Sequence, residues 1–199
     1  MKPSKITIQI SGVKLQLSST VVRSTDWNGK SITPYIQIRQ VEAASLIKQY
    51  VKARWPETCV NVTSQSYSGG CSCDTYLSNE YGFPVSETIY KDVENFAKEF
   101  QAGRFDGMTD CYNYNEVDSV SDNGTRIDSN CKYVFVNNRP KFGSKPDIIR
   151  SIREHMIGSY NCGVQTFEGA KKQIARYHKV TEIEKALVGV NLVEALKVA

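Results

Sequence analysis

Two β-rich runs separated by a glycine pair constrain the fold of this chain most strongly. Residues 59–67 read CVNVTSQSY and residues 71–77 read CSCDTYL, and only Ser68-Gly69-Gly70 separates them. Adjacent glycines give the backbone access to positive φ, which a tight hairpin connection requires and most residues resist. The pattern therefore predicts two antiparallel strands joined by a short turn.

Amphipathic helices are predicted on both sides of this hairpin. From Val41 to Trp55 apolar residues recur at helical spacing and end near a proline, with the stripe formed by Val41, Ala44, Ile47 and Val51. A second helix is predicted from an N-cap at Ser86 to a glycine at Gly103, with the stripe Ile89, Val93, Phe96, Ala97 and Phe100. Further β-rich runs follow, CYNYNEV and CKYVFVNN. The order predicts an α+β fold with both helices on one face of an antiparallel sheet; a ferredoxin-like βαββαβ order with one extra strand is one way to build it.

The two ends of the chain differ from this middle part. Alternating apolar residues from Ile6 to Leu17, broken at Ser11-Gly12, predict a β-hairpin, and residues 18–34 read as a looser linker. Residues 146–199 have helical periodicity. The last apolar stripe predicts docking on the domain, or else pairing with a second copy of the chain or with another protein; it consists of Ile183, Leu187, Val190, Val193 and Leu196. We therefore expect an N-terminal hairpin and linker at 1–34, an α+β core at 35–145 and a helical extension at 146–199.

Charge is unevenly distributed along the 199 residues. Residues 1–58 hold nine Lys or Arg against three Asp or Glu, residues 59–130 hold four against twelve, and residues 131–199 hold twelve against six. Such segregation predicts surfaces of opposite sign, one of which would meet a polyanion or an acidic partner. No stretch has the continuous apolar length of a membrane span or of a signal sequence, so we expect a cytoplasmic protein with no membrane partner.

The middle of the chain resembles a known family. Tyr67-Ser68-Gly69-Gly70 with Ser72, and Phe105-Asp106-Gly107-Met108 with Asp110, are the most specific pieces. Together with the flanking helices and KYVFVNNRPKFGS, they resemble the large polyvalent protein-associated domain number 29 of bacteriophages and other mobile elements, over roughly residues 35 to 145. The resemblance implies a compact α+β module carried among proteins of genetic conflict and genome delivery, and it implies no catalytic residues.

Basic residues give the first functional hypothesis, which is association with DNA or RNA. Lysines and an arginine on the first helix, and the loop NNRPKFGSK with a phenylalanine between its cations, suit phosphate contact and base stacking. The glycine turn lacks the residues of a P-loop, but its amides and serine hydroxyls can form a small anion nest. The predicted nucleic-acid contacts are Lys48, Lys52, Arg54, Ser68, Gly69, Gly70, Arg139, Lys141, Phe142 and Lys145.

Two alternatives use other residues. The acidic middle of the chain suits an inhibitor that binds a host protein, such as a defence enzyme, through Glu87, Asp92, Glu94 and Glu99. A metal-dependent enzyme would rest on Asp74, Asp106, Asp110 and the cysteines, which could hold zinc as thiolates. His155 and His178 fall in no metal-ligand motif. We therefore expect a protein that is not an enzyme and that needs no cofactor and no metal.

Overall fold

The computed structural model describes residues 6–18, 21–25, 28–109, 111–114, 119–158 and 166–191. The chain divides into two compact units. The first contains residues 1–56, 60–75 and 86–137, and the second contains residues 57–59, 76–85 and 138–199. The three-part division expected from the sequence stays a prediction. Within the described ranges, no helix has the length and apolar character needed to span a membrane.

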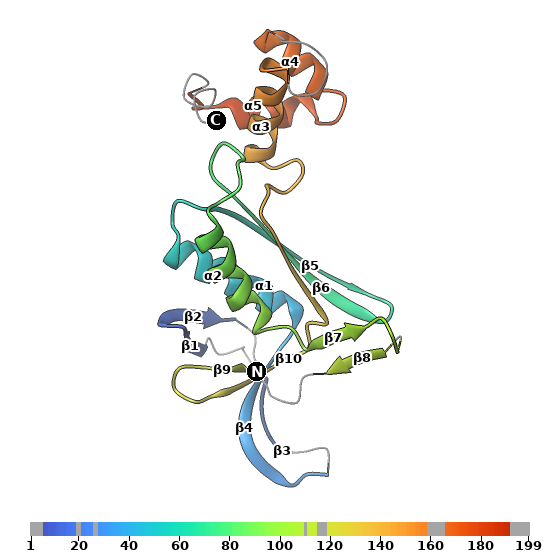
Figure 1. The fold of residues 1–199 in the computed structure, drawn as a ribbon. Coiled ribbons are helices and arrows are strands. Elements are labelled where there is room, and N and C mark those ends of the chain that lie inside the picture. Colours follow the sequence, from blue (N-terminus) through green and yellow to red (C-terminus); the bar gives the residue numbers. More distant parts are fainter. Residues whose placement is uncertain are drawn as a thin grey trace. The chain divides into compact units, whose positions relative to one another are not determined.

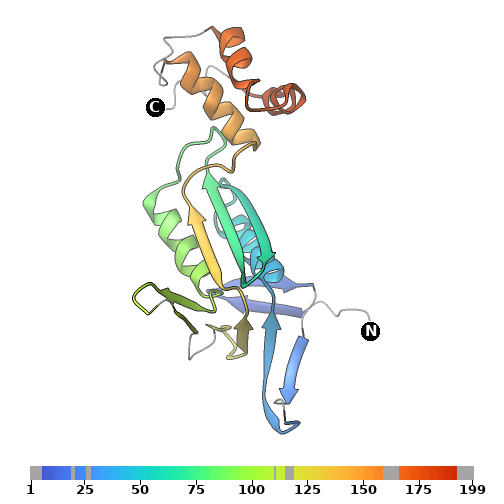
Figure 2. The same cartoon turned by 90° about the vertical axis from the view of Figure 1, so that its right-hand side faces the viewer.

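The centre of the fold is the predicted hairpin with the predicted helices beside it. Strands β5 (Cys59–Tyr67) and β6 (Gly70–Ser78) are joined by Ser68-Gly69, and β6 also pairs with β11 (Tyr133–Asn137). Helices α1 (Gln40–Arg54) and α2 (Glu87–Lys98) lie together on one face of these strands (Figures 1 and 2). The predicted α+β class, with two helices on one side, is confirmed.

The strand order differs from the ferredoxin-like arrangement. In that arrangement, the strand before α1 would lie between β11 and β6. Here β11 pairs directly with β6 and runs in the same direction (Figure 2), while β4 (Ser31–Ile38) pairs in parallel with β10 (Arg126–Ser129). The sheets are therefore small and mixed, because β4 pairs with β10, a strand that was not among those predicted from the sequence.

Helix α1 buries a different face from the one expected. Ile47 and Val51 are buried as predicted, but Val41 is half exposed, and the buried face is completed by Leu46 and Tyr50. The ring of Tyr50 stacks on Phe96 of α2 with centroids 3.7 Å apart, which joins the two helices. The buried face of α1 therefore lies beside the predicted stripe, which did not include Leu46 and Tyr50.

Helix α2 begins where the sequence predicted. The hydroxyl of Ser86 accepts a hydrogen bond from the amide of Ile89, at 3.4 Å, and so caps the first turn. The helix ends at Lys98, however, and Gly103 is not its C′ residue. Gly103 instead opens β7 (Gly103–Asp106), which pairs with β8 (Cys111–Tyr114) in a second hairpin.

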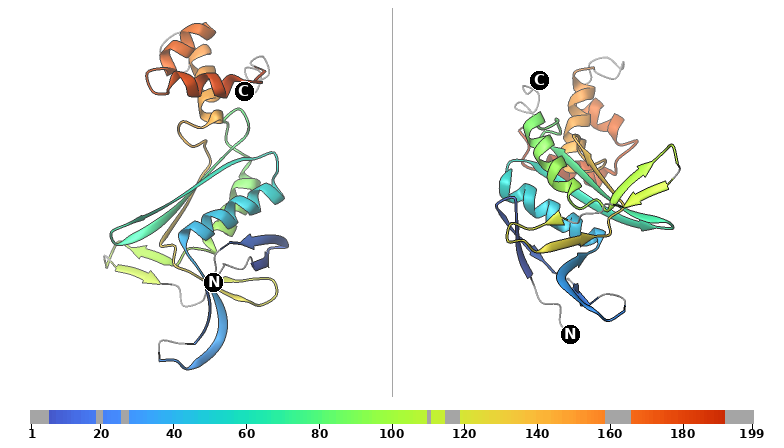
Figure 3. Two further views of the ribbon diagram at one scale, coloured as in Figure 1. Left: turned by 180° about the vertical axis from the view of Figure 1, so that it is seen from behind. Right: turned by 60° about the horizontal axis from the view of Figure 1, so that its bottom comes forward.

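The N-terminal hairpin is confirmed. Strands β1 (Ile6–Ile10) and β2 (Val13–Leu17) pair across Ser11-Gly12, whose φ angles of 51° and 76° are those of a turn that twists with the strands. Leu15 and Leu17 are fully buried, and the side chain of Gln49 on α1 exchanges hydrogen bonds of 2.8 and 2.9 Å with the backbone of Gln16. The hairpin thus packs beside α1 (Figure 3).

The linker predicted at 18–34 was wrong. Residues 21–25 form β3 (Val21–Thr25), which pairs with β4 in a sheet of order β3-β4-β10-β9, where β9 is Ser119–Val120. Pro34 suggested a break because proline donates no ladder hydrogen bond. It is tolerated because the register of β3 and β4 shifts between the pairs Arg23↔Tyr35 and Thr25↔Ser31, so Pro34 falls in the irregular segment between them.

The second unit is built on three helices. These are α3 (Lys145–Met156), α4 (Phe167–Ile174) and α5 (Val180–Leu187). Ile148 and Ile152 of α3 form a core with Ile174 and Ile183, which also includes Ala170 and Ala186. Helix α5 ends at Leu187, and the backbone is extended at Val188. Residues 192–199, and with them the predicted docking end of the chain, lie outside the described residues.

Candidate nucleic-acid interface

Aromatic side chains gather on the face of β11 that points away from the helices. Val134 is buried, so by strand alternation Tyr133 and Phe135 point to the opposite side, where Phe135 is half exposed. Tyr114 of the neighbouring strand β8 is 71% exposed. We call the following set the aromatic surface: Tyr67, Tyr112, Tyr114, Tyr133, Phe135 and Lys132.

The rings of this surface contact one another in a continuous row. Tyr112 meets Tyr114 and Tyr133 edge to face, with centroids 5.0 and 5.6 Å apart, and Tyr133 lies nearly parallel to Phe135 at 6.3 Å. The hydroxyl of Tyr112 also donates to the carbonyl of Lys132. Burial, together with nearby Tyr133, raises the pKa of Tyr112 to about 12, so this hydroxyl keeps its proton at neutral pH. The ring contacts and this hydrogen bond fix the position of Tyr112 in the row.

Lys132 places one positive charge within the row. Its ammonium lies 4.7 Å from the ring centre of Tyr112 and 5.7 Å from that of Tyr133, and it donates to the carbonyl of Gly69 at 3.0 Å. Such contacts hold the cation against the rings. A phosphate at this edge would therefore meet a lysine that is already positioned.

The glycine pair of the β5–β6 turn is explained by this packing. Gly69 has φ 89°, a conformation that strongly favours glycine, and the turn contains only Ser68 and Gly69. Gly70 belongs to β6, and a Cβ placed there would lie 3.0 Å from Cδ of Lys132 and 3.3 Å from the ring of Tyr67. The first glycine makes the turn, and the second lets the lysine cross the strand.

Gly103 has the same role in the second hairpin. It pairs with Tyr114, and a Cβ on it would lie 2.8 Å from the ring of Tyr112 and closer still to the carbonyl of Asn113. Phe105, half exposed, pairs with Tyr112 across the same strands. The β7–β8 hairpin therefore supplies two rings of the row, those of Tyr112 and Tyr114, and the ring of Tyr112 occupies the space that a side chain at position 103 would need.

The basic residues predicted to form one site fall in both units. Lys48, Lys52 and Arg54 are exposed on α1, and the hairpin tip carries exposed Ser68 and Gly69 and partly buried Gly70, all in the first unit. The remaining predicted contacts lie in the second unit: exposed Arg139, Phe142 and Lys145, and partly buried Lys141. Lys145 donates to the carbonyl of Val188 at 3.3 Å. Of the predicted residues, the structure brings only Ser68, Gly69 and Gly70 to the aromatic surface.

The acidic residues of the inhibitor hypothesis have partners inside the protein. Glu87 and Glu94 form ion pairs with Lys91 and Lys98 of the same helix, at 3.3 and 2.9 Å. Asp92 accepts hydrogen bonds from Tyr50, at 3.1 and 3.2 Å, and from Trp55, at 2.7 Å, and it pairs with Arg54 at 3.2 Å. Glu99 is the C-cap residue of α2.

The carboxylates of the metal hypothesis make local hydrogen bonds. Asp106 accepts from the amide of Met108 at 2.9 Å, and this bond lowers its pKa, while Asp74 accepts from the hydroxyl of Ser72 at 3.2 Å. Asp110 lies outside the described residues. Among the residues that are described, no group of three or more His, Cys, Asp or Glu side chains could hold a metal ion.

The cysteines near the sheet are buried thiols. Cys71, Cys73 and Cys131 are all buried, and burial raises the pKa of Cys73 to about 12 and also raises the pKa of Cys131.

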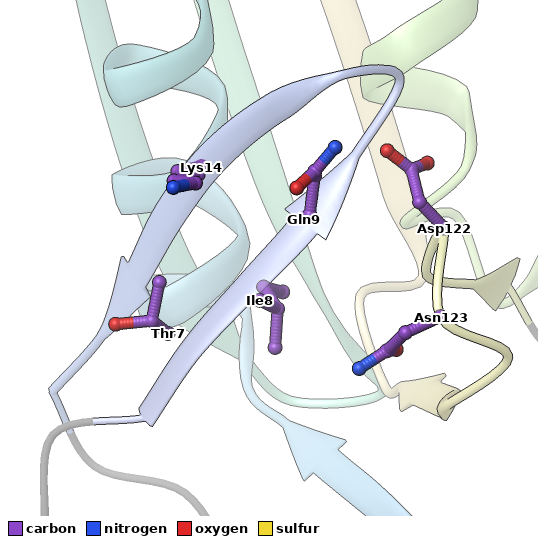
Figure 4. Close-up of a pocket in the computed structure, with 6 residues that line it drawn as sticks. All are labelled: Thr7, Ile8, Gln9, Lys14, Asp122 and Asn123. Carbon is purple, nitrogen blue, oxygen red and sulfur yellow. The ribbon is translucent and has the colours of Figure 1, made fainter.

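A hollow of about 430 Å³ lies between the N-terminal hairpin and the loop after β9 (Figure 4). Its walls include Lys14, Asp122 and Asn123. Asp122 accepts hydrogen bonds from the amides of Ser11 and Gly12, both at 2.8 Å. Its carboxylate therefore holds the hairpin turn, and the hollow is a by-product of that contact.

The sequence reasoning missed most of the aromatic surface. Tyr112 and Tyr114 lie in the run CYNY, and Tyr133 and Phe135 in KYVFV, where aromatic residues alternate along predicted strands. Aromatic residues two positions apart on a strand project from the same face, so each pair was visible in the sequence, whereas the meeting of the two pairs was not. The partner of Lys132 could not be found in the same way, because it depends on the pairing of β11 with β6.

The fold and the surface define an α+β protein with an open aromatic sheet face. The sequence matches the large polyvalent protein associated domain 29 over residues 38–143, and the chain belongs to that family, which associates it with phages and other mobile elements. No curated protein and no solved structure matches the chain.

Proposed function

We propose that this protein binds single-stranded nucleic acid at the aromatic surface, and that it acts by binding rather than by catalysis. The observation that carries the proposal is the row from Tyr114 through Tyr112 and Tyr133 to Phe135, with Lys132 against its rings. Every base presents a π-face that can stack on such rings, and a lysine beside them can contact the backbone. A duplex keeps its bases stacked on one another, so the surface suits unpaired strands.

The exposure of the rings supports this function. Tyr114, Phe135 and Tyr67 are each about half exposed or more, although they lie in or beside ordered strands. Contiguous exposed aromatic groups on a protein surface mark a binding site more often than scattered ones do. The carboxylates of the inhibitor hypothesis are less available, since Glu87, Glu94 and Asp92 already pair with basic residues of the first unit.

Fluorescence anisotropy of labelled oligonucleotides tests the proposal. We expect single-stranded DNA or RNA to bind more tightly than duplex, with binding that weakens as salt rises. Tyr114→Ala and Phe135→Ala should each weaken binding about 5- to 150-fold, from a loss of about 1–3 kcal/mol per stacked base. Lys132→Gln should reduce the salt slope by about 0.7 for a single phosphate contact.

Matched controls separate this surface from other parts of the first unit. Val22 is 54% exposed on β3, so Val22→Ala removes exposed apolar area without touching the rings. Lys52→Gln removes a cation from α1, where the sequence predicted contacts. Both variants should bind like the unaltered protein. Equal affinity for single strands and duplex, or unchanged binding by Tyr114→Ala and Phe135→Ala, would refute the proposal.

A further inference from the structure

The second unit contains a cavity of about 500 Å³. Its walls come from α3, from the end of α4 and the turn that follows it, and from Phe142. The chain has two histidines, His155 and His178, and both line this cavity although 23 positions separate them in sequence. The volume lies within the range of about 300–1,000 Å³ typical of small-molecule sites.

One wall of the cavity contains a buried carboxylate whose negative charge is balanced by neighbouring basic groups. Asp147 is buried and accepts hydrogen bonds from the amide of Gly143, at 2.9 Å, and from the guanidinium of Arg150, at 3.4 Å. Nε2 of His178 lies 3.9 Å from the same carboxylate. The negative charge of Asp147 is thus balanced within the wall, and Arg150 is held in place by it.

Other residues that line the cavity are cationic or aromatic. Arg176 is exposed, and among the described residues its guanidinium has no acidic partner. Phe142 stacks on His178 with centroids 4.8 Å apart, and Phe142 and Tyr177 are 70% and 69% exposed. A guanidinium is the side chain best shaped to hold a phosphate, and exposed rings suit a planar base.

We propose that this cavity binds a nucleoside monophosphate, with its phosphate at Arg176 and its base against Tyr177 and Phe142. The site lies in the second unit, and it does not depend on the aromatic surface of the first. Its ligand is the free mononucleotide or the terminal nucleotide of a strand, which share the same chemistry. His155 also lines the cavity and is fixed by a 2.8 Å hydrogen bond from Nδ1 to the carbonyl of Ser151.

The two histidines make the test specific to this cavity. In the full-length protein, NMR signals of the imidazole rings report on this site alone, because both rings line it. We expect adenosine monophosphate to shift both ring signals with saturation, and adenosine or inorganic phosphate to bind at least tenfold more weakly. Arg176→Gln should weaken nucleotide binding by about tenfold or more, as expected for a charge-assisted contact.

A control and a second probe distinguish the possible results. Lys172→Gln removes an exposed cation from α4 that does not line the cavity, and it should leave the titration unchanged. An oligonucleotide with a 5′-terminal phosphate, compared with the same strand lacking it, separates a strand end from the free mononucleotide. Histidine signals that do not move with any phosphate-bearing probe, or equal shifts with adenosine, would overturn the inference. Loss of oligonucleotide binding by the Tyr114 variant would leave this result untouched, so the two proposals fail separately.

Discussion

Asp92→Ala most directly tests whether the Asp92 carboxylate stabilises the fold or binds a partner. The sequence placed Asp92 on an acidic face for a host protein, whereas the structure makes it the acceptor for Tyr50 and Trp55 and the ion-pair partner of Arg54. Tyr50 is 2% exposed, so removing the carboxylate leaves its hydroxyl buried without its acceptor. The variant should therefore lose stability.

The expected loss can be estimated from each partner. An unsatisfied buried hydroxyl costs about 1–3 kcal/mol, and the lost bond from the Trp55 indole costs about 0.5–1.5 kcal/mol. Arg54 is 46% exposed, so solvent screens its ion pair with Asp92 to at most about 1 kcal/mol. We expect Asp92→Ala to lower the free energy of unfolding by about 2–5 kcal/mol, with the largest part from Tyr50.

Urea unfolding, followed by circular dichroism at pH 7, measures this loss. Glu94→Ala is the matched control, since Glu94 pairs only with Lys98 on the helix surface and its removal should cost about 0.5 kcal/mol. In a Tyr50→Phe background, Asp92→Ala should cost less stability, because the Tyr50 hydroxyl that would lose its acceptor is no longer present. A cost like that of Glu94→Ala, or one unchanged by Tyr50→Phe, would refute the reasoning.

Two further predictions concern stability. Burial and the charge of Asp92 raise the pKa of Tyr50 from 10.0 to about 12, so the unfolded chain loses this proton first as pH rises. The stabilisation is complete below pH 10 and should fall by about 1–3 kcal/mol towards pH 12. Urea unfolding in a pH series measures this change. Gly82 has φ 83°, and a Cβ there would lie 2.7 Å from Cβ of Arg150, so Gly82→Ala should destabilise the protein by about 2–4 kcal/mol in thermal unfolding. Gly189 has φ 72° but open space around it, so Gly189→Ala should cost only about 1–2 kcal/mol. Equal losses for the two glycines would contradict the steric argument.

Local patterns predicted the elements that local physics decides. The hydroxyl of Ser86, the Ser11-Gly12 turn and the stripe from Val93 to Phe100 all act over a few residues, and each was found where it was expected. The parallel pairing of β4 with β10 was missed, since it joins residues about 90 positions apart. The strand β3 was missed although its partner β4 follows closely in the sequence, because Pro34 suggested a break in this part of the chain.

The candidate site was predictable only in part for the same reason. The glycine turn was identified, but its neighbour Lys132 reaches Gly69 from 63 residues away. The two histidines were read as separate helix residues, and only the packing of α3 and α4 brings them to one cavity. Residue spacing indicates on which face of its helix or strand a side chain lies. Which residues contact that face depends on pairing between segments that are distant in the sequence.

The absence of a side chain at Gly103 follows from the aromatic surface above it. A Cβ would lie 2.8 Å from the ring of Tyr112, and the nearby backbone of Asn113 cannot yield as a flexible side chain would. Gly103→Ala should therefore displace Tyr112, which contacts both Tyr114 and Tyr133, and so break the row at its centre. Single-stranded binding should then fall at least as much as in Tyr114→Ala, while the imidazole signals of His155 and His178 stay in place. Binding retained by a folded Gly103→Ala variant would show that the row need not be continuous, and would move the proposed contact to Lys132 and the hairpin tip.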